Sequence, residues 1–135
     1  MSVTAPSCLS DVVDVVRRLE ATRPTEPLRP IHGDMKLEHV FLDADRTILI
    51  DTESVALGLA DYDLAQMFGR IWQAELEGLL PTSLAHSASA LVRDAAGTSF
   101  DWCLGVVAVR LAKYHAQRPG PDTERSIRAI LGKLL

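Results

Sequence analysis

Apolar residues recur every three to four positions over most of this chain, the spacing of amphipathic helices. A first helix is predicted after Ser10, which we expect to cap it, and it should end before Pro24. Another helix is predicted after residue 60, and three more follow over about 84–95, 100–115 and 127–134. The apolar stripe of the helix after residue 60 consists of Leu64, Met67, Phe68, Ile71 and Trp72.

A small β-hairpin is predicted within the first half of the chain. Two β-prone runs, Val40–Leu42 and Thr47–Ile50, flank the turn-forming sequence DADR. The segment TRPTEPLRP before them contains three prolines and is expected to be an extended connector. We therefore predict one mainly helical α+β domain over residues 1–135: a helix and proline-rich connector over 1–30, a loop and hairpin over 31–54, and a helical subdomain over 55–135.

Composition fits a folded protein. The 135 residues are 47% hydrophobic and 24% charged, which argues against disorder. The net charge of −4 does not indicate a general nucleic-acid surface. The two cysteines, Cys8 and Cys103, have no metal-binding or redox spacing, and neither a signal-peptide pattern nor an 18-residue apolar run is present. We expect a cytoplasmic protein without membrane or nucleic-acid partners.

Acidic residues gather between positions 34 and 63, where eight occur against only Lys36 and Arg46. Asp34 lies in a polar loop, and Asp51 directly follows an apolar strand. The hairpin between them would fold the chain back so that the two carboxylates approach each other. In phosphoryl transfer, one carboxylate accepts a hydrogen bond from the attacking hydroxyl and another holds Mg²⁺, which prefers oxygen ligands. The two acids suit these two tasks.

Three motifs resemble those of the aminoglycoside phosphotransferases and related small-molecule kinases. The run HGDMKLEHV, from His32, is similar to their catalytic loop, which reads His-Gly-Asp, four residues, then Asn. ILIDTES resembles the following strand and metal-binding Asp, and GLADYDLAQM resembles their Gly-Asp-Pro-x-x-Asp-Leu-Ala segment. The resemblance covers about Leu9 to Leu135 and implies a protein-kinase-like C-terminal lobe, a helical bundle with a small hairpin.

The resemblance also implies roles for individual residues. Asp34 would orient or deprotonate the acceptor hydroxyl, and Lys36 would lie near the transferring phosphate. Asp51 would hold the Mg²⁺ that accompanies ATP, the phosphoryl donor. His32 would hold the loop against the metal-binding segment. Asp63 would cap its helix and brace the catalytic loop.

The chain departs from the family pattern at two places. His39 stands where the family has Asn, in the nucleotide and metal site, and imidazole is a poorer Mg²⁺ ligand than an amide oxygen. This change implies a different use of the metal or a loss of activity. Gly58-Leu59-Ala60 replaces Gly-Asp-Pro and removes one acid. Glu53 has two alternative interpretations: a solvated surface residue, or a contributor to the metal site.

The features of a nucleotide-binding lobe are missing from the sequence. Kinases of this type use a glycine-rich strand-turn and a lysine paired with a helical glutamate. Only 31 residues precede His32, and none of the eight glycines lies in a Gly-x-Gly-x-x-Gly pattern. We expect a C-terminal lobe that is inactive or nearly so alone, with the other lobe supplied by a partner chain; self-association and a truncated chain are also open.

Two other functions fit the same residues. The chain could be a non-catalytic interaction module derived from a kinase lobe, or a carboxylate–metal hydrolase that uses the same acids. The acceptor, a hydroxyl of a small molecule or a peptide, is not identified by the sequence.

Overall fold

A computed structural model describes residues 8–118 and 120–133 of the chain. The chain is mainly helical, with two small two-stranded sheets, which confirms the α+β, mainly α prediction. Within the described ranges, every helix is too short or too polar to cross a lipid bilayer. The chain divides into two compact units, one formed by the described residues of 1–24 and 105–135 and the other by residues 25–104.

The first unit is helical. It contains α1 (Leu9–Ala21), the part of α4 (Phe100–Gln117) from Gly105 onward, and α5 (Thr123–Gly132). Ser10 does not cap α1 as predicted, because the helix begins two residues earlier than expected, at Leu9, and Cys8 occupies the capping position. The helix ends before Pro24 as predicted. The buried core of this unit consists of Cys8, Val15, Ala112, Ile127 and Leu131.

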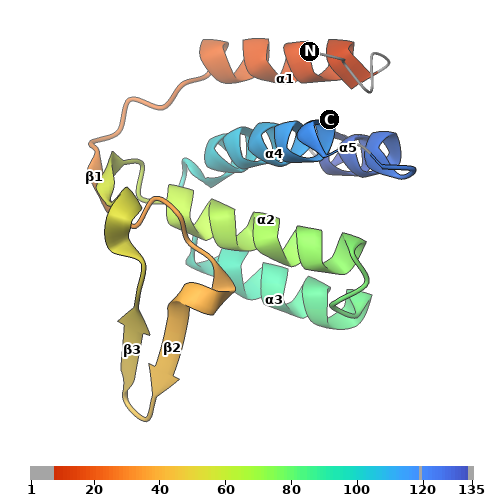
Figure 1. Cartoon of the computed structure of the whole chain (residues 1–135). Helices are drawn as coiled ribbons and strands as arrows, with labels where there is room; N and C mark the ends of the chain where they lie inside the picture. Colours follow the sequence, from red (N-terminus) through yellow and green to blue (C-terminus); the bar gives the residue numbers. More distant parts are fainter. Residues whose placement is uncertain (1–7, 119, 134–135) are drawn as a thin grey trace. The chain divides into compact units, whose positions relative to one another are not determined.

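The second unit is built around two helices that lie side by side, α2 (Tyr62–Leu76) and α3 (Thr82–Ala95) (Figure 1). The predicted apolar stripe of α2 is turned inward, with Phe68, Ile71 and Trp72 all buried. The Phe68 ring meets Trp72 edge-on at a centroid distance of 5.0 Å and Phe100 at 5.5 Å. The contact with Phe100, on α4, holds this side of α2 against the core and leaves its polar side for the loop before the hairpin.

Two antiparallel strand pairs hold the segment that carries the motifs. The predicted hairpin is confirmed as β2 (Val40–Asp43) and β3 (Arg46–Leu49), and Figure 1 shows it projecting from the helices of this unit. A second pair, β1 (Arg29–Ile31) with β4 (Ala56–Gly58), was not predicted. It joins the residues just before His32 to those just after the hairpin, so both ends of the motif segment are fixed.

The start of α2 is tied to the connection between α3 and α4 by Asp61, which the sequence did not single out. Its buried carboxylate accepts hydrogen bonds from the Gly97 N–H at 2.8 Å, the Ser99 N–H at 3.1 Å and the Ser99 hydroxyl at 3.0 Å. Asp61 also occupies the capping position of α2, so the prediction that Asp63 caps this helix is wrong. The carboxylate of Asp63 points to a different loop.

Candidate active site

The His-Gly-Asp loop is held by the first turn of α2. The carboxylate of Asp63 accepts hydrogen bonds from the backbone N–H groups of His32 at 2.7 Å and Gly33 at 2.9 Å. Gly33 has a φ of +84°, and a Cβ atom there would collide with the carbonyl oxygen of Ser54. The loop therefore requires glycine for both its backbone conformation and its close approach to the segment after Asp51.

Gln66 fixes the same loop and was missed by the sequence analysis. Its buried amide donates to the Gly33 carbonyl at 3.0 Å and accepts from the Met35 N–H at 2.9 Å. Asp63 and Gln66 are three residues apart and thus lie on one face of α2. This spacing of two polar residues beside an apolar stripe is the sequence pattern that could have indicated a role for Gln66. Together their side chains fix the backbone on both sides of Asp34.

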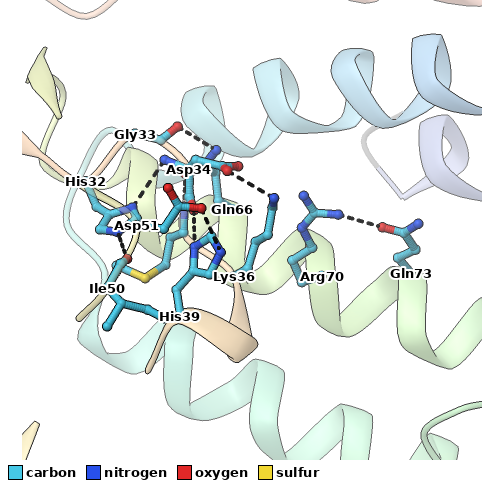
Figure 2. Close-up of polar contacts among 11 residues, drawn as sticks. His32, Gly33, Asp34, Lys36, His39, Ile50, Asp51, Gln66, Arg70 and Gln73 are labelled. Atoms are coloured by element: carbon cyan, nitrogen blue, oxygen red, sulfur yellow. Dashed lines mark hydrogen bonds and ion pairs between the residues drawn. The ribbon is translucent and has the colours of Figure 1, made fainter. Parts of the chain in front are cut away.

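The buried ring of His32 joins the loop to the strand end. Its Nδ1 accepts from the Asp34 N–H at 3.4 Å, so the proton lies on Nε2, which donates to the Ile50 carbonyl at 2.8 Å (Figure 2). The Ile50 N–H in turn donates to the His39 carbonyl at 3.0 Å and continues the ladder of the hairpin. The residue before Asp51 is thus bonded on both sides.

Asp51 leaves the strand in an unusual backbone conformation. Its φ of 59° and ψ of 60° lie in the left-handed region, which few residues other than glycine adopt and which Asp tolerates better than most. Such conformations persist where the surrounding structure holds them, often at functional sites. Here the turn directs the half-exposed carboxylate toward the catalytic loop (Figure 2).

Asp34, His39 and Asp51 come together at this point. Each offers one ligand atom, and these atoms all lie within 4.8 Å of one another. The Nε2 atom of His39 is 3.3 Å from a carboxylate oxygen of Asp51. Glu53 is exposed and is not a member of this group. The loop acid and the strand-end acid therefore face a common space, with an imidazole between them.

Two cations lie beside Asp34. Lys36 Nζ is 3.0 Å from its carboxylate, and Arg70, which the sequence analysis did not single out, contributes a further positive charge from α2. Burial raises the pKa of Asp34, but the hydrogen bond and charge of Lys36, with the charges of Arg70 and His39, outweigh it and lower the pKa below its usual value. Arg70 itself donates to Gln73 at 3.2 Å (Figure 2). The Asp34 carboxylate is thus kept ionised.

The family model of the phosphotransferase enzyme family (APH) matches residues 3–102, well over half of the chain. The chain belongs to this family. Searches of curated proteins and of solved structures found no match. Membership indicates a phosphotransferase-like function and kinase-type ancestry, in agreement with the resemblance of the three motifs. Members of the APH family generally use ATP and Mg²⁺.

The side chains present at the site of this APH-family chain fit a divalent cation. Asp34 and Asp51 offer carboxylate oxygens, the ligands that hard cations prefer. His39 adds a nitrogen, which is better suited to transition metals than to Mg²⁺.

Proposed function

We propose that this chain is the kinase-like C-terminal lobe of an APH-family phosphotransferase that moves the terminal phosphoryl group of Mg-ATP to a hydroxyl of a small molecule or peptide. The observation that supports the proposal most is the convergence of Asp34 and Asp51 on one space, with Lys36 beside them. A cytoplasmic setting fits the two free cysteines, Cys8 and Cys103.

In the proposed reaction, Asp34 acts on the acceptor. Its ionised carboxylate accepts the hydroxyl proton while the hydroxyl oxygen forms a bond to the γ-phosphorus. The bond between that phosphorus and the bridging oxygen breaks, and its electron pair leaves with ADP. Lys36, now paired with Asp34 at 3.0 Å, would turn to the phosphoryl oxygens and stabilise their charge.

Asp51 and His39 would hold the divalent ion of the nucleotide. When bound, that ion neutralises phosphate charge. Asp51 is directed to this position by its left-handed turn, and His32 and Ile50 fix the backbone that leads to it. Asp63 and Gln66 keep the Asp34 loop in place and do not touch the substrate in this scheme.

We further propose that a partner chain supplies the nucleotide-binding lobe. Large apolar side chains of the second unit are exposed on and beside the hairpin, with Leu42 82% and Leu57 68% accessible. Exposed apolar groups of this kind favour association with another surface. The remaining members of this set are Phe41, Ile48, Leu49, Ile50 and Val55.

The proposal is tested by calorimetric titration with Mg-ATP and by phosphoryl-transfer assays, with and without the product of the adjacent upstream reading frame. We expect binding and turnover only in the reconstituted complex. Asp34→Asn should lower turnover about 10²- to 10⁴-fold through loss of the general base. Asp51→Asn should weaken Mg-ATP binding. Asp43→Asn, at an exposed acid in the hairpin, is the matched control and should change neither quantity. Full activity of the Asp34 and Asp51 variants would exclude the proposal.

The alternative is a non-catalytic interaction module, and His39 is the observation that favours it. An imidazole replaces the amide oxygen of the family pattern directly beside Asp51. On this alternative, no Mg-ATP binding is detected with any partner, and His39→Asn does not restore it.

A further inference from the structure

His39 is buried to an unusual degree for a histidine beside an exposed strand end. Its side chain is only 9% accessible, whereas that of Asp51 is 44% accessible. The Nδ1 atom lies 3.1 Å from the backbone carbonyl oxygen of Asp34. Because a carbonyl oxygen only accepts, the proton of the neutral ring must lie on Nδ1. The Nε2 atom then faces a carboxylate oxygen of Asp51, 3.3 Å away.

A ring nitrogen and a carboxylate oxygen at that distance need a positive charge between them, which is either a proton on Nε2 or a bound metal ion. Metal-binding histidines almost always donate their other ring N–H to a backbone carbonyl or carboxylate, as His39 does to Asp34. Two ligands at about 2.1 Å from one ion, near right or tetrahedral angles, lie about 3.0–3.4 Å apart. The separation of 3.3 Å between His39 and Asp51 falls within that range.

We propose that His39, Asp51 and Asp34 bind a first-row transition-metal dication, of the Co²⁺ or Zn²⁺ type, in preference to Mg²⁺ and without nucleotide. All three ligand atoms lie within 4.8 Å, so a small movement of Asp34 completes the set. An imidazole with two carboxylates favours such ions over Mg²⁺, which binds all-oxygen sites and loses its water reluctantly. The inference rests on the proposed function, in which Asp51 and His39 hold the divalent ion of the nucleotide, but binding itself requires neither nucleotide nor transfer.

The positive charge of Lys36 competes with a metal ion for Asp34, which allows an independent test of the metal site. Its ammonium lies 3.0 Å from the Asp34 carboxylate and must move away when Asp34 binds a metal. Removal of this charge should therefore strengthen metal binding, although the same change should weaken phosphoryl transfer. The opposite signs separate the metal site from the transfer reaction.

The experiment uses the full chain, freed of any affinity tag, and Co²⁺ as the probe. Binding is followed by the visible absorption of Co²⁺ without nucleotide, and then with Mg²⁺ in hundredfold excess. We expect the excess Mg²⁺ to leave Co²⁺ bound. Because loss of a group that only supports a ligand costs about 10- to 100-fold in metal affinity, His39→Asn, which removes a ligand, should weaken Co²⁺ binding by about 100-fold or more. His86→Asn, the same change at an exposed histidine of α3, is the control and should match the wild type. Lys36→Met should bind Co²⁺ more tightly.

Equal Co²⁺ affinities of the wild type and the His39 variant would overturn the inference. So would displacement of Co²⁺ by an equal concentration of Mg²⁺, or no binding at all, which would assign a proton to Nε2. If His39→Asn fails to fold, the ¹⁵N resonances of the wild-type imidazole give the answer, because Zn²⁺ should shift Nε2 far more than Nδ1. Phosphoryl transfer is measured separately, as turnover of the wild-type chain in the reconstituted complex with Mg-ATP and without Co²⁺.

Discussion

Asp61 and Asp63 are two residues apart at the start of α2, yet their carboxylates hold different loops. Asp63 accepts the N–H groups of the catalytic loop, and Asp61 accepts those of Gly97 and Ser99. Replacing each with Ala gives two matched variants at one helix end. The loop that loosens should depend on which acid is removed.

The expected size of the effect follows from the hydrogen bonds lost. A hydrogen bond to a charged group contributes about 1.5–3 kcal/mol, and water partly replaces the acceptor where the loop is accessible. For the two half-buried bonds of Asp63 we expect a local loss of about 2–4 kcal/mol. For the three bonds of the buried Asp61 we expect about 3–5 kcal/mol. Either loss is a large fraction of ordinary domain stability.

Amide hydrogen exchange measured residue by residue by NMR distinguishes the two variants. Since about 1.4 kcal/mol corresponds to tenfold, Asp63→Ala should speed exchange of the His32 and Gly33 amides about 30- to 1,000-fold. The amides of Gly97 and Ser99 should change far less in that variant. In Asp61→Ala the pattern should reverse. If exchange of the same amides were accelerated equally in both variants, the assignment of the two carboxylates to separate loops would be refuted.

Three further predictions concern single side chains. Gly33→Ala should lower the midpoint of thermal unfolding and cost about 1–3 kcal/mol of stability or more, because residue 33 has a left-handed backbone and the added methyl group would collide with Ser54. An unchanged midpoint would contradict the loop geometry. The pKa of Asp34 is lowered in the folded protein, so its carboxylate stabilises the fold above its unfolded pKa, and this contribution is lost as pH falls through its native pKa. In urea titrations, the free energy of unfolding of Lys36→Met should therefore fall less with decreasing pH than that of the wild type. Equal decreases would contradict this. Burial raises the pKa of Cys103 to about 11, so about one thiol in a thousand is ionised at pH 8. Iodoacetamide should therefore label Cys103 only after denaturation, which mass spectrometry of its peptide would show. Labelling of native Cys103 at the rate of a free thiol would contradict its burial.

Much of the secondary structure could be predicted because it depends on local patterns of apolar and polar residues. The apolar stripe of α2 and the two β-prone runs of the hairpin depend on neighbours within a few residues. The three-residue strands β1 and β4 escaped prediction, since each is too short to show a period and forms only by pairing with the other. Their pairing closes the motif segment at both ends.

The sequence by itself determined the helices, the hairpin and the order and spacing of the His32, Asp34 and Asp51 motifs, from which the family resemblance followed. Only the tertiary structure decided how the site is held. Gln66 reaches the loop across 31 and 33 residues of sequence, and Asp61 anchors Gly97 across 36. Helices and hairpins arise from contacts between near neighbours, whereas these polar contacts exist only after the chain has folded, so a local pattern does not identify their partners.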